Sequence, residues 1–325
     1  MSQAATGLAD IVEQDDDPNR ELQQILDGLS CSQKTLSPKY FYDEHGSELF
    51  EEITHQPEYY PTKTELAIMR DNIDEIVALI GRQASLIEFG AGSNLKIRLL
   101  LQHLLDPAVY VPVDISRDFL LAAAEDLAVD FPHIEILPVA ADFTKAFDLP
   151  SPKVMPKRNI VYFPGSTIGN FPPEDALALL KVMYQEAGAD GGLLIGVDLR
   201  KNPNVLNQAY NDAKGVTAAF NLNILRHINR EFNADFLLES FEHEAIYNED
   251  AGRIEMYLVS SRKQSFTVSG HTFSIDADER ILTEHSHKYS LESFAELAAK
   301  AGFEVLRKGA IADYRDKIFS SFAND

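Results

Sequence analysis

The feature that most constrains this chain is a short apolar run that ends in two closely spaced glycines. Residues 85–89 have the mostly hydrophobic character of a buried strand, and Gly90 and Gly92 follow at once. Glycines at such a turn let the backbone lie close to a ligand. A helical repeat of apolar residues begins at Ile97, and the next apolar run ends in Asp114. We therefore expect a nucleoside site at the carboxyl ends of two parallel strands, where Asp114 suits ribose hydroxyls.

The spacing of the glycines limits which nucleoside can bind. A dinucleotide fingerprint has a third glycine three residues after the second, so that a helix N-terminus can approach a pyrophosphate. Leu95 occupies that position, which disfavours a nicotinamide dehydrogenase. The pattern Glu88-x-Gly90-x-Gly92 resembles motif I of class I S-adenosylmethionine-dependent methyltransferases, whose ligand carries no phosphate. A turn that merely joins a strand to a helix would use the same glycines.

The composition favours small molecules as partners. A formal net charge of −22 is unsuited to nucleic acid, because polyanion binding depends on lysine and arginine. No charge-free apolar run approaches the roughly 18 residues that a membrane-spanning helix needs. The N-terminus lacks a secretory signal, and the single cysteine, Cys31, cannot form an internal disulfide. We expect a cytoplasmic monomer with no membrane partner.

A metal site is not expected. The nine histidines form no His-Glu-x-x-His motif. His285 and His287 could share a strand face, but two histidines without a third nearby ligand are weak evidence for a metal.

The chain divides into two parts by the pattern of its segments. Strands and helices alternate from residue 85 to 199, which predicts an α/β fold with a doubly wound parallel sheet. The expected strands are 110–113, 134–139, 159–164 and 192–198, and the expected helices are 117–129 and 174–187. Later segments predict a helical stretch at 205–231, strands at 239–247, 253–261 and 264–275, a helix at 291–300, and closing strands at 303–307 and 317–322.

These patterns predict the domain boundaries. Residues 1–65 and 83–199 are expected to form the cofactor-binding domain, with an acidic, flexible arm at residues 1–20. Residues 66–82 and 200–325 are expected to form a substrate-binding α+β domain.

Eight segments carry motifs that occur together, in this order, in one family. They are residues 37–43, 46–50, 57–62, 89–93 with Lys96, 163–171, 215–221, 229–231 and 283–289. On these segments the chain resembles the histidine-specific Nα-methyltransferases of ergothioneine biosynthesis, over nearly its whole length from about residue 36. The resemblance implies a class I methyltransferase (Rossmann-like) fold. It also implies transfer of three methyl groups from S-adenosylmethionine to the α-amine of L-histidine, which gives hercynine.

The resemblance implies a set of residues around S-adenosylmethionine. Two of them also follow from the strand pattern, because Asp114 ends the second strand and Asp142 the third. Asp142 would accept from the adenine amino group while Phe143 packs on the ring, although Asp142 could equally be a helix N-cap. The implied cofactor residues are Tyr42, Gly90, Lys96, Asp114, Asp142 and Phe143.

For the amino-acid substrate, the resemblance implies Tyr59, Asn170 and Tyr210 at the α-amino and carboxylate groups. Asn170 follows the fourth strand, and its amide can accept from an amine and donate to a carboxylate. Tyr59 and Tyr210 could instead be packed core residues. We assign catalytic roles to Tyr42, Tyr59 and Asn170, with Tyr42 or Tyr59 relaying a proton to water.

The histidine side chain is expected at Glu284 and Ser286. Residues two apart on an extended segment share a face, so Glu284 can accept from an imidazole N–H while Ser286 binds the other nitrogen. Thr283, His285 and His287 would lie on the opposite face, and without the resemblance the segment could equally be an exposed polar strand. Met256 would add an apolar wall or would be a plain core methionine.

Two rival functions remain at this stage. A related enzyme could methylate another amino acid or a tryptophan-derived amine, but Glu284 argues against an indole pocket. A non-catalytic S-adenosylmethionine-binding protein would not need residues for both ligands.

Overall fold

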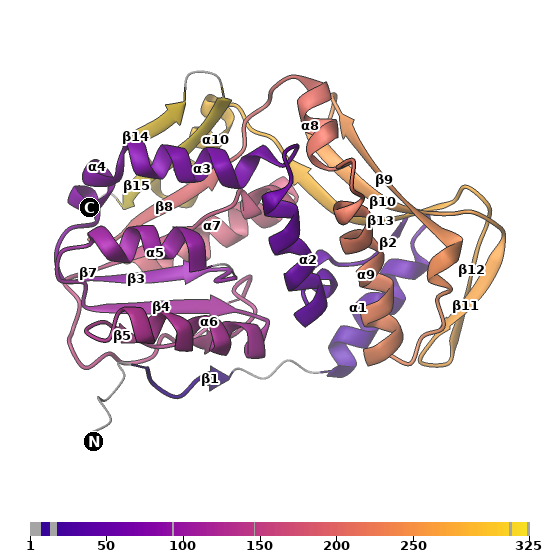
Figure 1. Cartoon of the computed structure of the whole chain (residues 1–325), viewed down its shortest axis with the longest axis horizontal. Coiled ribbons are helices and arrows are strands. Elements are labelled where there is room, and N and C mark those ends of the chain that lie inside the picture. The colour runs from indigo at the N-terminus through magenta and orange to yellow at the C-terminus, as the bar shows by residue number, and fades with distance from the viewer. Residues whose placement is uncertain (1–7, 14–17, 93, 146, 312–313, 324–325) are drawn as a thin grey trace. The chain divides into compact units, whose positions relative to one another are not determined.

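The structure is a computed structural model of the 325-residue chain, and it describes residues 8–13, 18–92, 94–145, 147–311 and 314–323. The chain divides into two compact units (Figure 1). The described parts of residues 1–15, 61–200 and 289–325 form the first unit. Residues 18–60 and 201–288 belong to the second.

The first unit is built on a nine-stranded sheet, counted over the described residues, in the order β1-β6-β4-β3-β7-β8-β15-β14 with β5 beside β4. Strands β3, β4, β7 and β8 pair in parallel, and β15 pairs antiparallel with β8 and β14. The strands are β1 (Val12–Glu13), β3 (Ala84–Phe89), β4 (Val109–Asp114), β5 (Glu135–Ile136), β6 (Val139–Ala140), β7 (Arg158–Phe163), β8 (Gly192–Val197), β14 (Phe303–Ile311) and β15 (Tyr314–Ala323).

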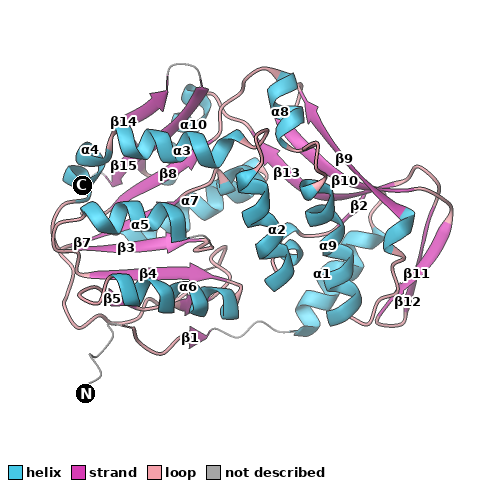
Figure 2. Ribbon diagram, in the orientation of Figure 1, coloured by secondary structure: helices cyan, strands magenta, loops and turns pink. Residues whose placement is uncertain are grey.

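Helices cover both faces of this sheet (Figure 2). Alternate residues along a strand point to opposite faces. Leu86 packs in a core cluster with side chains of α4, α5 and α6, whereas its neighbour Ile87 packs in a second cluster with α7 and α10. The predicted doubly wound sheet is therefore confirmed. The helices of this unit are α3 (Tyr60–Asp71), α4 (Ile73–Ile80), α5 (Asn94–His103), α6 (Arg117–Asp130), η2 (Thr167–Asn170), α7 (Pro173–Ala187) and α10 (Leu291–Ala301).

The second unit is an α+β structure around a four-stranded sheet in the order β2-β13-β10-β9. Its core joins this sheet to α1, α2 and α9, and it includes the stacked rings of Phe41 and Phe220, whose centroids lie 4.5 Å apart. Its elements are α1 (Pro18–Ser30), β2 (Lys34–Thr35), η1 (Pro38–Phe41), α2 (Glu44–His55), α8 (Pro203–Ala209), α9 (Val216–Glu231), η3 (Leu238–Ser240), β9 (Phe241–Asn248), β10 (Arg253–Ser260), the hairpin of β11 (Gln264–Val268) and β12 (His271–Ile275), and β13 (Arg280–His287).

The domain boundaries differ from those predicted. Residues 18–60 belong with the second unit, because α1, η1 and α2 pack against its core rather than on the large sheet. Residues 66–82 and the described part of 289–325 belong with the first unit, since α3 and α4 cover the large sheet and β14–β15 extend it.

Three predicted segments also need correction. Within the predicted flexible arm, residues 1–7 and 14–17 lie outside the described residues, but β1 pairs with β6 and α1 begins at Pro18. The strand predicted at 134–139 is interrupted before Pro138, because proline has no N–H for a ladder. The helical stretch at 205–231 is two helices, separated where Gly215 takes a φ of 73°. Across the described residues, none of the helices has the length and apolarity that a bilayer crossing requires.

Candidate functional site

In the first unit, the turn after β3 places Gly90 beside the ring of Phe143. Gly90 has a φ of 73°, which favours glycine, and a Cβ built there would lie 3.8 Å from the Phe143 ring. The N–H groups of Gly90 and Ala91 both donate to the Val113 carbonyl, which holds this turn against the end of β4. The structure thus brings together the predicted Gly90 and Phe143.

Asp114 ends β4 and is partly buried. Its Oδ1 accepts from the Ser116 N–H at 2.8 Å. Burial raises the pKa of Asp114 to about 6, although hydrogen bonds from residues 115 and 116 oppose that rise. The group is therefore mostly charged at neutral pH and acts as a hydrogen-bond acceptor at the end of β4.

Asp142 is held by its own loop. Its Oδ1 accepts from the Thr144 N–H at 3.1 Å and from the Thr144 hydroxyl at 2.5 Å, and its Oδ2 pairs with Lys145 at 2.6 Å. Burial would raise its pKa, but these bonds outweigh burial and lower it. No described helix begins here, so Asp142 caps a turn rather than a helix.

Lys96 forms an ion pair with Glu65 of α3. Its Nζ donates to Glu65 Oε2 at 2.5 Å, and the Glu65 carboxylate also accepts from the Gly165 N–H at 3.0 and 3.1 Å. A Cβ on Gly196 would lie only 2.2 Å from Glu65 Oε1, so β8 needs glycine there. Glu65 thus connects α3 and α5 to the loop after β7. Sequence reasoning missed Glu65, which gave no signal beyond being one acidic residue in a helical segment.

That loop leads to Asn170, the last residue of η2. The turn depends on Gly165 with a φ of 82° and Ser166 with a φ of 59°, and the Ser166 hydroxyl accepts from the Asp198 N–H. Within the described part of the chain, the partly buried Asn170 amide has no hydrogen-bond partner. Its donor and acceptor therefore remain available to a ligand.

In the second unit, Tyr42 follows η1 and packs against aromatic rings. Its ring centroid lies 5.6 Å from that of Phe220 and 5.8 Å from that of Phe50. The next residue, Asp43, caps α2 by accepting from the Gly46 N–H at 2.8 Å. A Cβ on Gly46 would collide with the Phe41 carbonyl, which makes glycine obligatory at this tight turn.

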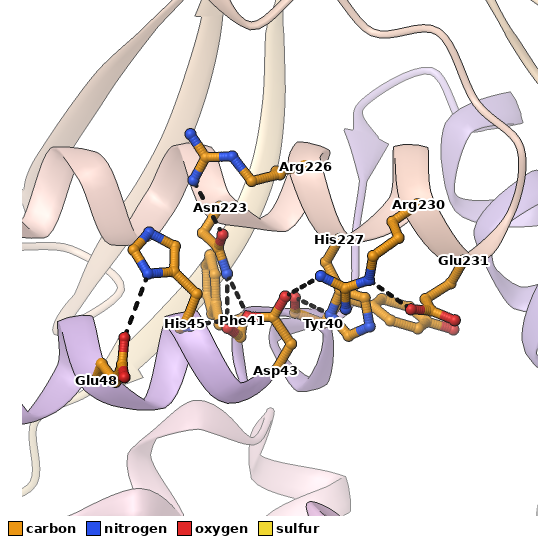
Figure 3. Close-up of polar contacts among 11 residues, drawn as sticks. Tyr40, Phe41, Asp43, His45, Glu48, Asn223, Arg226, His227, Arg230 and Glu231 are labelled. Carbon is orange, nitrogen blue, oxygen red and sulfur yellow. Dashed lines mark hydrogen bonds and ion pairs between the residues drawn. The ribbon is translucent and has the colours of Figure 1, made fainter.

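Side chains of α9 fix the segment on both sides of Tyr42 (Figure 3). Asn223 donates to Asp43 Oδ1 at 2.7 Å and to the Phe41 carbonyl at 3.3 Å, and Arg230 pairs with Asp43 Oδ2 at 2.8 Å. Burial would raise the pKa of Asp43, but hydrogen bonds from Gly46, Arg230 and Asn223 lower it. The backbone that carries Tyr42 is therefore anchored by a charged network in which Asn223 and the Asp43 carboxylate are buried and Arg230 is exposed.

Tyr210, Ser286 and Lys288 form a second polar cluster in this unit. The Tyr210 hydroxyl donates to Ser286 Oγ at 2.8 Å, and Lys288 Nζ donates to the same oxygen at 2.8 Å and to the Tyr210 oxygen at 3.1 Å. The ring of Tyr59 lies 6.4 Å from that of Tyr210, nearly edge to face. The predicted Tyr59, Tyr210 and Ser286 thus lie together, and the structure adds Lys288.

Glu284 lies opposite Met256 in the pairing of β13 with β10, and Ser286 lies opposite Ile254. Met256 is 1% exposed and belongs to the core of the unit. Glu284 is 8% exposed, yet its carboxylate makes no hydrogen bond or ion pair with the described residues. Burial raises its pKa to about 7, and the nearby Lys288 partly opposes this rise.

A bulge in this strand pair changes the predicted faces. The register shifts between Met256 and Tyr257, and the Thr283 hydroxyl donates to Asn221 of α9, on the core side of the sheet. The expectation that Thr283 lies with His285 and His287 on the far face is therefore wrong.

His285 and His287 both lie on β13. Their ring centroids are 5.8 Å apart, and burial lowers the pKa of His287 to about 4. Among the described residues, no group of three potential ligands could hold an ion.

Comparisons with known proteins agree with this geometry. Residues 21–315 match a family model described as "Histidine-specific methyltransferase, SAM-dependent". The chain is 40% identical to a histidine N-alpha-methyltransferase of Mycolicibacterium smegmatis, covering 86% of this chain and 88% of that one. It is 36% identical to a histidine N-alpha-methyltransferase of Mycobacterium tuberculosis, covering 88% and 89%.

A solved structure supports the fold. An S-adenosylmethionine-dependent methyltransferase from Clostridium acetobutylicum superposes with a TM-score of 0.51 at 11% identity, covering 86% of this chain and 99% of that one. With the strand order of the large sheet, this similarity confirms the predicted class I methyltransferase fold.

Proposed function

Since the chain belongs to the histidine-specific, S-adenosylmethionine-dependent methyltransferases, we propose that it transfers three methyl groups to the α-amine of L-histidine. The product is the betaine hercynine, a precursor in ergothioneine biosynthesis. The observation that carries the proposal is the buried pair of Glu284 and Ser286 on β13. The Glu284 carboxylate has no partner among the described residues and lies in a mostly apolar core. Its burial is unfavourable in free energy unless a ligand pairs with it.

The first unit supplies residues that fit S-adenosylmethionine. Gly90 has no side chain to occupy the space beside Phe143, and we assign the Asp114 carboxylate to the ribose hydroxyls. We assign Asp142 to the adenine amino group, and Lys96 and Tyr42 to the remainder of the cofactor. When bound, the cofactor supplies an electrophilic methyl group on a sulfonium sulfur.

The chain's own residues position the amine and remove its protons. Only a neutral amine has a lone pair for the methyl carbon, so in-line alignment of that amine is the main catalytic task. Asn170, Tyr59 and Tyr210 are assigned to the α-amino and carboxylate groups. Each transfer leaves an ammonium that must lose a proton to water before the next transfer, and we assign this relay to Tyr42 or Tyr59.

The imidazole is assigned to Glu284 and Ser286, with Met256 beside them. An indole has one N–H and no bare nitrogen, so it would leave the Ser286 hydroxyl without an acceptor. This argues against a tryptophan-derived substrate. The enzyme is proposed to act as a cytoplasmic monomer on small molecules, without nucleic acid, membrane or metal partners.

The decisive experiment is incubation with S-adenosylmethionine and a mixture of amino acids, analysed by mass spectrometry. The proposal predicts that histidine alone gains three methyl groups. Methylation of a different amino acid, or of none, would contradict it.

A further inference from the structure

Lys288 is a buried lysine that has no assigned role in the proposed methyl transfer. It directly follows β13, is 3% exposed, and its backbone N–H donates to the Gly252 carbonyl. Its Nζ reaches both Ser286 Oγ and the Tyr210 hydroxyl. Burying an ammonium group is costly, so this arrangement requires compensating contacts.

The contacts of Lys288 determine what Ser286 can do. An ammonium group only donates hydrogen bonds, and the Tyr210 hydroxyl also donates to Ser286 Oγ. Both lone pairs of the serine oxygen are then occupied. With both of these groups donating to Ser286 Oγ, the capacity left to the serine is its own hydrogen. In this arrangement Ser286 acts as a donor toward a ligand acceptor.

Glu284, two residues earlier on the same strand, has the opposite polarity. Its carboxylate accepts, and it has no hydrogen-bond partner among the residues that the structure describes. A donor and an acceptor on one strand match a ring with one N–H and one bare nitrogen.

We propose that Lys288 is a positioning residue that locks Ser286 as a donor, so that the pocket selects the neutral imidazole of histidine over imidazolium. Imidazolium has two N–H groups and no acceptor for the Ser286 hydroxyl, and the lysine charge opposes the attraction that the Glu284 carboxylate has for it. The proposal rests on the histidine specificity proposed above and names the residue that determines which charge state of the ring is bound.

The test compares Lys288→Met with the native enzyme on two substrates, histidine and 1,2,4-triazole-3-alanine. The triazole keeps one N–H and bare nitrogens but stays neutral where imidazole, with a pKa of about 6.5, becomes charged. The ratio of kcat/KM for the two substrates, measured at about pH 5.5 and about pH 8, isolates the ring charge. Titration of the α-amine and of protein groups common to both reactions largely cancels in this ratio.

In the native enzyme, the ratio of kcat/KM for histidine to kcat/KM for the triazole should fall at the lower pH. In Lys288→Met this ratio should fall clearly less. At about pH 8 the KM for histidine should rise at least about tenfold in Lys288→Met, with kcat changing far less. Lys288→Arg should recover part of the loss. Lys34→Met is a matched control, because Lys34 lies on the neighbouring strand β2, pairs with Glu279 and is assigned no ligand.

A double variant distinguishes an effect that acts through Ser286 from a general structural effect of losing Lys288. In the Ser286→Ala background, Lys288→Met should raise KM further by less than about threefold, because the hydroxyl that it orients is gone. An unchanged KM and an unchanged pH ratio in Lys288→Met would overturn the proposal while leaving the histidine activity intact. If the native enzyme did not methylate histidine at all, the proposed function itself would fail.

Discussion

The side-chain amide of Asn223 lies 2.7 Å from the carboxylate of Asp43 and so attaches the start of α2 to α9 (Figure 3). Asn223 is fully buried, and it also holds the Phe41 carbonyl. Tyr42 lies between these two anchored residues. Its position is therefore set by the interior of the second unit and not by its own loop.

Asn223→Ala should misplace Tyr42 and weaken the fold. Loss of the amide leaves the Asp43 carboxylate and the Phe41 carbonyl with fewer donors, which should cost about 1 to 3 kcal/mol of unfolding free energy. Urea denaturation measures this loss, and kcat should fall more than the affinity for histidine. Asn211→Ala, which removes a similar side-chain to backbone bond near α8, serves as the control. Native kcat in a folded Asn223→Ala protein would contradict the positioning role.

Asp114→Ala should weaken S-adenosylmethionine binding at least about tenfold, because charge-assisted hydrogen bonds to the ribose are lost. Since the pKa of Asp114 is about 6, native affinity should also decline as the pH falls below that value. Calorimetry measures both effects. The decline should be absent in Asp114→Asn, and unchanged affinity in folded Asp114→Ala would remove this residue from the site.

Glu284→Ala should raise the KM for histidine strongly while leaving cofactor affinity nearly unchanged. The imidazole N–H loses its acceptor, and a site built for a hydrogen-bonding group discriminates by that group. Glu284→Gln retains an acceptor oxygen and should lose less. If the native enzyme methylated phenylalanine or leucine as fast as histidine, the imidazole assignment would be wrong.

Glu88→Gln should make the first unit more stable than in the native protein, and this advantage should grow as the pH rises. Tyr110 donates to the buried Glu88 carboxyl at 2.5 Å, and burial raises the pKa of Glu88 from 4.5 to about 8. The stabilising effect of protonated Glu88 is complete below about pH 4.5 and is lost as the pH rises through about 8. Relative to the native protein, the variant should gain roughly 2 to 4 kcal/mol across that range. Denaturation at several pH values measures the difference in unfolding free energy between the variant and the native protein. A difference that stayed constant with pH would contradict this prediction.

Histidine should gain three methyl groups, and synthetic dimethylhistidine should also be a substrate. A methylated amine keeps a lone pair once deprotonated, whereas the quaternary product does not. The rings of Tyr42 and Tyr59 can stabilise the fixed cation by about 0.5 to 2 kcal/mol. A time course that stopped at the monomethyl product, with excess cofactor present and S-adenosylhomocysteine removed, would reject this expectation.

The large sheet was predictable because its central strands are buried on both faces. Residues 192–197, for example, are almost continuously apolar, as expected for a parallel strand beneath helices. The boundaries between the units were not predictable. The amphipathic pattern of α1 and α2 shows that they bury one face, but it does not say against which core.

The site was predictable only in part, for a related reason. Glycines and strand-end carboxylates such as Gly90 and Asp114 leave a mark in the sequence, because a turn or a sheet edge demands them. Glu65 and Lys288 act through residues far away in the chain or through a bulged strand, and no local pattern records those contacts. The bulge that moves Thr283 also breaks the simple alternation from which its face was predicted.

The position of β15 has a consequence for how the protein is made. This strand comes from the C-terminal end of the chain, yet it pairs with β8 inside the large sheet, between β8 and β14. On the ribosome, β8 emerges long before β15 and must present an unpaired edge while residues 201–288 are being synthesised. Such an edge is a template for pairing with other chains. The nascent enzyme therefore depends on residues 314–323 to close its own sheet, and a transcript that ends before β15 should yield aggregated protein instead of a smaller working domain.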